Sequence, residues 1–341
     1  MAASCMKSET SSLTPQSTVD IYISGTTRAA NGNSVAAYWK NGVETKLTDS
    51  AVNSEGHDIA VNGSNVYIVG DIQNNLSVYN AAYWKNGTLT RLPNNGDVNI
   101  SGASQIKLQG NDVHIAGNVG NNAGDIEAAY WKNDALTILP SKFSGSVGNA
   151  LAINGNDIYI VGCTKFDNNI TNQLWVASYW KNGGSPTILL DNPVPIESDI
   201  YAVGLNGADL YTAGYVIQGP GHYKATYWKN GVATSLTDGP SGQVVTAIAF
   251  QGSDVYMSGS TIYNGHNVAT FWKNGLATIL TDGSSNSNAS DIIVDGPDIY
   301  IAGVTNTNDA YGTLTYWKNG IPTYLSKGVA YNVDMVVVHN Q

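Results

Sequence analysis

The sequence predicts an all-β fold, a seven-bladed β-propeller with four-stranded antiparallel blades. Three observations lead to this prediction: a motif that recurs seven times, two hairpin turns within each repeat, and an offset between the repeats and the ends of the 341-residue chain. Self-similarity at a fixed period of about 20–50 residues is typical of solenoids and propellers.

A tryptophan motif marks each repeat. The string Tyr-Trp-Lys-Asn, which becomes Phe-Trp-Lys-Asn in the sixth copy, recurs every 44 to 49 residues, at Trp39, Trp84, Trp131, Trp180, Trp228, Trp272 and Trp317. A second segment, typified by 66–70, ends in glycine at Gly25, Gly70, Gly117, Gly162, Gly214, Gly259 and Gly303. Seven copies of each segment indicate seven units.

One unit, taken from residues 58–92, contains four strand-like runs. They are runs A to D, at 58–61, 65–71, 81–85 and 88–92. Asn62-Gly63 separates the first two, and Asn86-Gly87 separates the last two. Asn-Gly favours a two-residue type I′ hairpin because both residues tolerate positive φ. Each unit is therefore expected to be a four-stranded antiparallel meander.

The middle runs of each unit are apolar on both faces, with Ala82 and Trp84 on one face and Tyr83 on the other. Such strands need a cover on each side. Stacking the units as blades around an axis supplies both covers. Burying one tryptophan ring at ~25 cal/mol/Å² contributes at most about 4–6 kcal/mol. Packing therefore explains the repeated tryptophan without a ligand.

The chain begins inside a unit, at a run B (20–25), and ends after a run A (334–338). The last segment is thus expected to supply the innermost strand of the first blade and to close the ring. We expect residues 19–341 to form one propeller domain, and residues 1–18 to form a polar tail or lipoprotein tether.

Composition excludes several classes of protein. The formal charge of −10 and the pI near 4.7 argue against a nucleic-acid partner, which requires a basic face. The sequence contains no run of 18 apolar residues, so no membrane span is expected. Two cysteines, Cys5 and Cys163, are too few for a disulfide framework, and Cys163 is expected to be a small buried residue. We expect a monomer.

Cys5 follows Ala2, Ala3 and Ser4, and this pattern resembles the end of a bacterial lipoprotein signal peptide with Cys5 as the acylated residue. The alternative is an accidental N-terminal tail. Across 19–338, the YWKNG strings and the NGxDVYxxG turns resemble the repetitive β-propeller lipoproteins of bacterial envelopes. That resemblance implies a propeller and a cell-envelope or extracellular location, with a lipid anchor if Cys5 is acylated, and it implies no established activity.

One end of the predicted propeller is variable. The A–B and C–D turns are short and uniform, whereas the glycine-to-tryptophan distance across the B–C loop is 13 or 14 residues in six units and 18 in the fourth. The longer loop carries Phe166 and Trp175. Variable loops on a rigid scaffold commonly bind ligands. The other candidates for ligand binding on this face are His222, Tyr223, Tyr263, His266 and Tyr311. The alternative is that Trp175 folds back onto its own blade.

Two further sets recur on the uniform end. The first comprises Lys40, Lys85, Lys132, Lys181, Lys229, Lys273 and Lys318, and the second comprises Asp112, Asp157, Asp209, Asp254 and Asp298. We interpret the lysines as solvated residues that protect strand edges, with anion binding as the alternative. The aspartates are expected to accept hydrogen bonds from local backbone amides.

Three aspartates form a candidate metal site. Asp334, Asp58 and Asp291 begin run A of the first, second and seventh blades, which are neighbours in a closed ring. Gln105 and Lys107 occupy run A of the third blade. Carboxylate oxygens are ligands for Ca²⁺, so a calcium ion at the channel mouth is one interpretation. In the other, each aspartate caps the start of its strand.

The sequence contains none of the motifs HExxH, GxSxG, Walker A or CxxC, and no catalytic residue is predicted. The leading hypothesis is a non-catalytic cell-envelope protein that binds a glycan or a protein through its variable face. The first alternative is a multivalent lectin with one site per blade. The second is a glycan-active enzyme that uses the carboxylates of the channel mouth.

Overall fold

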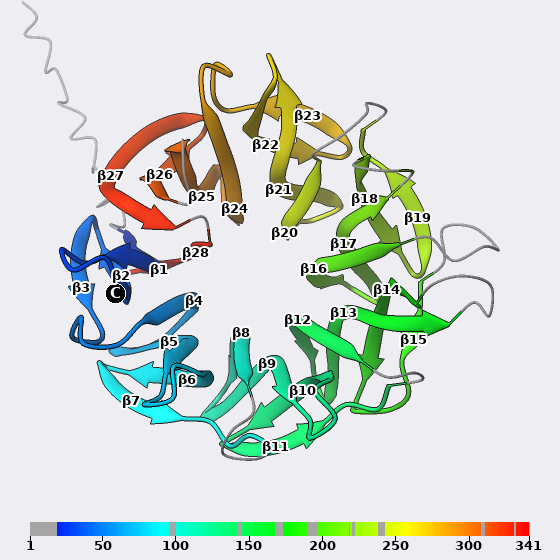
Figure 1. Ribbon diagram of the computed structural model, residues 1–341. Helices are drawn as coiled ribbons and strands as arrows, with labels where there is room; N and C mark the ends of the chain where they lie inside the picture. The colour runs from blue at the N-terminus through cyan, green and yellow to red at the C-terminus, as the bar shows by residue number, and fades with distance from the viewer. Residues whose placement is uncertain are drawn as a thin grey trace, which may run out of the picture.

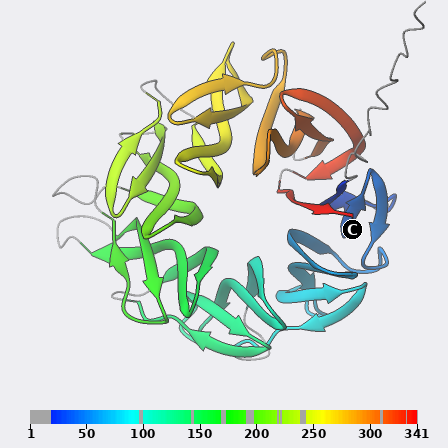
Figure 2. The same cartoon turned by 180° about the vertical axis from the view of Figure 1, so that it is seen from behind.

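The computed structural model describes residues 19–95, 100–141, 145–167, 173–189, 197–217, 219, 222–237, 243–307, 311–330 and 332–340. Its regular elements in these ranges are all β-strands, arranged in radial sheets around a central axis (Figures 1 and 2). Within the same ranges there is no helix that is long and apolar enough to cross a membrane.

Five sheets have four antiparallel strands each, and the strands follow one another in sequence order. The strands of the first two are β4 (Ser54–Asn62), β5 (Asn65–Gln73), β6 (Tyr79–Lys85) and β7 (Thr88–Arg91), then β8 (Ser101–Gln109), β9 (Asp112–Gly120), β10 (Ile126–Lys132) and β11 (Ala135–Ile138). The third contains β12 (Ser146–Asn154), β13 (Asp157–Asp167), β14 (Gln173–Lys181) and β15 (Thr187–Ile188). The fourth and fifth contain β16 (Ser198–Asn206), β17 (Asp209–Ile217), β18 (Tyr223–Lys229), β19 (Val232–Ser235), β20 (Val244–Gln251), β21 (Asp254–Tyr263), β22 (His266–Lys273) and β23 (Leu276–Ile279).

The sixth sheet has eight strands and contains both ends of the described chain. Its strands are β24 (Asn286–Asp295), β25 (Asp298–Thr307), β26 (Tyr311–Lys318), β27 (Ile321–Ala330), β28 (Asp334–His339), β1 (Val19–Arg28), β2 (Ser34–Lys40) and β3 (Val43–Lys46). Strand β28 pairs with β1 from Val19–His339 to Ser24–Asp334. The predicted all-β propeller, with its first blade closed by the C-terminal strand, is confirmed.

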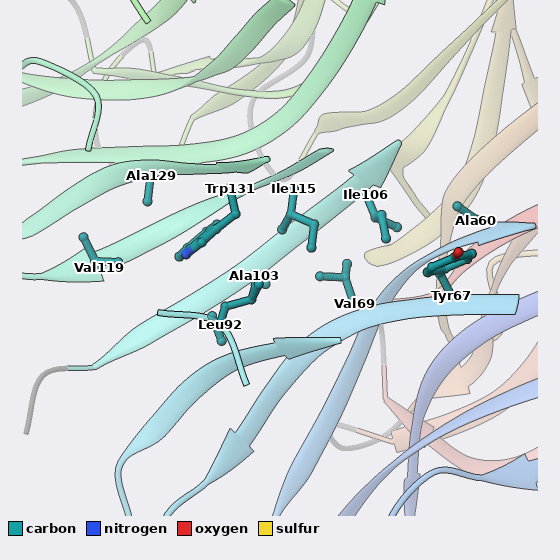
Figure 3. Close-up of a cluster of buried hydrophobic side chains, with 11 residues drawn as sticks. Ala60, Tyr67, Val69, Leu92, Ala103, Ile106, Ile115, Val119, Ala129 and Trp131 are labelled. Atoms are coloured by element: carbon teal, nitrogen blue, oxygen red, sulfur yellow. The ribbon is translucent and has the colours of Figure 1, made fainter. Parts of the chain in front are cut away.

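The seven motif tryptophans are buried between sheets, each no more than 1% exposed. Around Trp131, side chains of the β8–β11 sheet such as Ile106 and Ile115 pack against Val69 and Leu92 of the preceding sheet (Figure 3). Each ring therefore joins two neighbouring sheets, as the sequence predicts.

The uniform end repeats one polar arrangement. Lys132 Nζ lies 2.8 Å from Asp112 Oδ2, Asn133 Nδ2 donates to Asp112 Oδ1 at 2.8 Å, and the amide of Val113 donates to Asn133 Oδ1 at 2.9 Å. The same lysine–aspartate pair recurs in Lys40–Asp20, Lys181–Asp157, Lys229–Asp209, Lys273–Asp254 and Lys318–Asp298. The prediction that these aspartates accept hydrogen bonds from backbone amides is wrong. The turn asparagine accepts the backbone amide, and the aspartate carboxylate pairs with the lysine.

The buried tryptophans differ in one hydrogen bond. Trp131 Nε1 donates to the carbonyl of Pro93 at 2.8 Å, whereas Trp84 Nε1 is buried with no hydrogen-bond partner in the described part of the chain. We expect Trp131→Phe to lower the free energy of unfolding by about 1 kcal/mol more than Trp84→Phe, because only Trp131→Phe leaves a carbonyl unpaired. Thermal and urea unfolding of the two variants would measure this, and equal losses would contradict it.

Candidate functional site

A glycine inside the second strand of six repeats allows a close backbone approach. A Cβ added at Gly70 would lie 1.9 Å from the carbonyl oxygen of Glu55, and one at Gly117 would lie 2.1 Å from that of Gly102. Gly162, Gly214, Gly259 and Gly303 meet the opposite carbonyl at 1.9 to 2.0 Å. No side chain fits at such a distance. Only glycine therefore permits the innermost strand to come this close.

Next to each of these contacts the innermost strand has a β-bulge. The register of β4 against β5 skips His57, and the innermost strands of the next five sheets skip Ser104, Asn149, Tyr201, Thr246 and Ser290. A bulge adds an unpaired residue and redirects its side chain. All six residues line one cavity of about 330 Å³ at the mouth of the central channel.

The three predicted aspartates gather at this channel. Asp58 and Asp334 line the cavity at its mouth, and Asp291 and Asp334 line a second cavity of about 300 Å³ that adjoins it. Asp58 Oδ2 accepts the amide of Ile106 at 2.8 Å and lies 3.8 Å from Lys107 Nζ. Asp291 Oδ2 accepts the amide of Met335 at 3.1 Å. These bonds reach neighbouring innermost strands, so the carboxylates do more than cap their own strands.

Burial and mutual repulsion raise the pKa values of Asp334 and Asp291 in this cluster. Burial raises the pKa of Asp334 well above its ordinary value, and the carboxylates of Asp291 and Asp58 raise it further. Burial also raises the pKa of Asp291 to about 6, although Lys107 opposes the shift. Among the described residues, no three His, Cys, Asp or Glu side chains are grouped so as to hold a metal ion. Calcium at the aspartates stays a prediction.

Asp334 makes stability depend on pH. Because the pKa of its carboxyl is raised in the folded state, that state binds the proton more tightly than the unfolded chain does. Stability is therefore lost as the pH rises from about 4 through the folded-state pKa. We expect Asp334→Asn to melt several degrees above the unmodified protein at pH 8 and close to it at pH 4.

Thermal unfolding at both pH values measures this difference. Glu44→Gln, on the exposed strand β3, is the control with the same change in charge. If Asp334→Asn changed the melting temperature by the same amount at pH 4 and at pH 8, the raised pKa of Asp334 would be contradicted.

A row of three tyrosines leads outward from the cavity across the β16–β19 sheet. The ring centroids of Tyr201 and Tyr215 are 6.0 Å apart, and those of Tyr215 and Tyr223 are 4.9 Å apart with an edge-on geometry. Tyr201 and Tyr223 are each 37% exposed. The row therefore presents aromatic surface beside the polar channel mouth.

Asp199 lies beside this row. Asn149 Nδ2 donates to its Oδ1 at 3.0 Å, and burial raises the pKa of the Asp199 carboxyl to about 6. Burial raises the pKa of the Cys163 thiol far above its ordinary value, and the charge of the Asp199 carboxylate raises it further. Cys163 is a buried free cysteine, as predicted.

The predicted loop residues come from four different sheets. Trp175 pairs with Lys165 across β13 and β14, next to the pair formed by Phe166 and Leu174. Lys165 Nζ lies 5.5 Å from the centre of the Trp175 ring and 3.7 Å from Asp125. Trp175 is thus half-buried, with one side occupied by Lys165.

The remaining predicted residues lie apart from Trp175. Tyr263 and His266 flank the β21–β22 turn, and Tyr311 accepts the Arg28 guanidinium over its ring, 5.2 Å from the centroid. His222 directly precedes Tyr223, the first residue of β18. Of these residues, only Tyr223 belongs to the row. Cys5 and residues 168–172 of the long loop lie outside the described residues.

The bulge residues His57, Ser104, Asn149, Tyr201, Thr246 and Ser290 were missed from sequence. The sequence predicts that the innermost strand of the second unit begins at Asp58, whereas β4 begins at Ser54. The bulge interrupts the alternation of buried and exposed residues along the strand. The residues before the bulge therefore do not show the sequence pattern of a β-strand. The glycine repeated on the adjacent strand is the signal that could have revealed it.

No family model matches this sequence, and no curated protein matches it. Among solved structures, the chain is similar to the β-propeller domain of the Trilobed protease from Pyrococcus furiosus, with a TM-score of 0.54, 11% identity, and coverage of 90% of this chain and 95% of that one. A puromycin-hydrolyzing peptidase of Mycobacterium tuberculosis and a puromycin hydrolase match with TM-scores of 0.55 and 0.56, each at 12% identity and over 91% of this chain. This chain spans 54% and 52% of their lengths. These likenesses show the propeller fold.

Proposed function

We propose that this chain is a non-catalytic binding propeller that recognises a glycan at the channel mouth. The observation that supports this most directly is the cavity of about 330 Å³, where hydroxyl and amide side chains of several sheets converge beside the half-exposed ring of Tyr201. Small-molecule sites combine aromatic surface with a few converging polar groups. A sugar ring presents an apolar face to an aromatic ring and hydroxyls to the polar groups around it.

We also infer that the propeller has seven blades. The eight-stranded sheet consists of β24–β27 and of β28 with β1–β3, and the single residue pair Thr27–Val329 joins these halves. Each half has its own buried motif tryptophan, Trp317 or Trp39. Counting the halves as separate blades gives seven units that repeat the same four-stranded arrangement.

The repeated Tyr-Trp-Lys motif supports a lectin with one site per blade less well. Its tryptophans are buried, and six of its seven lysines are paired with aspartates. A single channel site predicts a stoichiometry of one ligand per chain. The neighbouring structures include peptidases, but their low identity carries no catalytic residue to this chain. A cell-envelope location through acylated Cys5 remains part of the proposal.

A glycan-array screen of the purified protein, with and without calcium, tests the proposal. We expect a reproducible hit, and we expect Tyr201→Ala to abolish its binding because the variant removes the aromatic surface at the cavity. Tyr324→Ala, an exposed tyrosine on β27, is the matched control and should bind normally.

Trp175→Ala separates the channel mouth from the long β13–β14 hairpin as the binding surface. Loss of binding in Trp175→Ala with normal binding in Tyr201→Ala would place the site on the hairpin and refute the channel site. A screen with no hit would refute glycan recognition and favour a protein ligand.

A further inference from the structure

Another cavity, of about 350 Å³, is lined mainly by residues of the β4–β7 and β8–β11 sheets. These two sheets are neighbours in the ring (Figure 1). One wall is polar and comes from the first sheet, through Glu55, Asp71 and Tyr79. The opposite wall is built by Gly102 and by two isoleucines, Ile100 and Ile126. The cavity therefore combines two carboxylates and a phenol with apolar surface.

The two carboxylates are in an unfavourable position relative to each other. Glu55 lies directly opposite Asp71 in the β4–β5 ladder. Like charges in such a pair destabilise a sheet. Tyr79 Oη donates to Glu55 Oε1 at 3.3 Å, and Asp71 Oδ1 accepts the amide of Ala103 at 2.9 Å. The second oxygens of the two carboxylates, Glu55 Oε2 and Asp71 Oδ2, take no part in these two hydrogen bonds.

His57 is the nearest cation to these second oxygens. Its Nε2 lies 3.6 Å from Glu55 Oε2 and 3.8 Å from Asp71 Oδ2, distances longer than a hydrogen bond. Burial lowers the pKa of His57, but Asp71 and Glu55 outweigh this effect and raise it to about 9. Two carboxyl groups therefore face a single imidazole, so the acidic groups of the cavity outnumber the basic one.

Gly102 leaves the Asp71 carboxylate accessible from the cavity. A Cβ built on Gly102 would lie 3.5 Å from both carboxylate oxygens of Asp71, and a larger side chain would cover them. The equivalent positions of other sheets carry side chains, namely Glu55, Val147, Asp199, Val244 and Asn288. Of these six described positions, only Gly102 lacks a side chain.

The rim of the cavity is apolar and exposed. Ile100 is 62% exposed and Ile126 is 45% exposed, although both are large aliphatic side chains. An occupant of the cavity would cover them and remove apolar surface from water. A ligand that satisfies both walls needs an aliphatic segment that ends in a positive charge.

We propose that this cavity binds a primary ammonium group carried on an aliphatic chain, with the ammonium between Glu55 and Asp71 and the chain against Ile100 and Ile126. The ammonium donates to Glu55 Oε2 and Asp71 Oδ2 and supplies a second positive group beside His57. Both a lysine side chain and a small diamine carry this group. The site is separate from the proposed glycan site.

Isothermal titration calorimetry of the full chain tests the site with four probes: cadaverine, pentan-1-ol, N-acetyl-lysine methylamide and N-acetyl-norleucine methylamide. We expect the two ammonium probes to bind and their neutral counterparts not to bind. Binding of both ammonium probes indicates a site open to small amines, and binding of the lysine probe alone indicates a polypeptide ligand.

Two variants locate the binding. Glu55→Gln removes one carboxylate and Gly102→Val covers the other, and each is expected to weaken ammonium binding about tenfold or more. Gly102→Val introduces a residue found at the equivalent positions Val147 and Val244, so it should fold. Glu44→Gln controls for the change in charge, and Tyr201→Ala should leave ammonium binding intact.

Three results would overturn the proposal. They are equal binding of the neutral and charged probes, unchanged affinity in folded Gly102→Val, and a loss in Glu44→Gln as large as in Glu55→Gln.

Discussion

The close contact between a glycine and the carbonyl opposite it determines both the packing and the chemistry of this propeller. At Gly70 and its equivalents, a Cβ would overlap the backbone of the innermost strand. The innermost strand can therefore bulge at this point in six sheets, and each bulge adds one side chain to the channel mouth. The outer parts of the sheets stay nearly uniform, with a buried tryptophan and a lysine–aspartate pair. Variation is concentrated where the bulges face the channel.

The channel wall is chemically asymmetric although the repeats are similar. The position after the bulge is Asp58, Gln105, Ala150, Ala202, Ala247 and Asp291 in successive sheets, and Asp334 occupies it in β28. One side of the channel wall therefore carries three neighbouring carboxylates, and the other side carries alanines at the equivalent positions. Tyr201, on the alanine side, supplies aromatic surface. A ligand at the channel mouth would meet acidic groups on one side and an aromatic ring on the other.

Much of the fold could be predicted from the sequence because its determinants repeat. The recurring tryptophan motif indicated the number of repeats, and the Asn-Gly pairs indicated the hairpin turns. The offset of the chain ends identified β28 as the partner of β1. The gathering of Asp58, Asp291 and Asp334 followed from their equal places in the repeat. The bulges could not be found by alternation, since one extra residue reverses which face each following side chain occupies. His57 and Tyr201 were missed for that reason, and the ligand-binding residues predicted instead belong to separate sheets.

The pairing of β1 with β28 has a mechanical consequence. The strands are antiparallel, and Val19 lies opposite His339, so both chain segments leave this pair at the same end. Tension applied through those segments would load one residue pair at a time and open the six pairs in sequence, as a zipper opens. A strand pair pulled from opposite ends would instead share the load among all its hydrogen bonds. The ring can thus resist heat through its buried tryptophans and still yield to a modest pulling force at its seam.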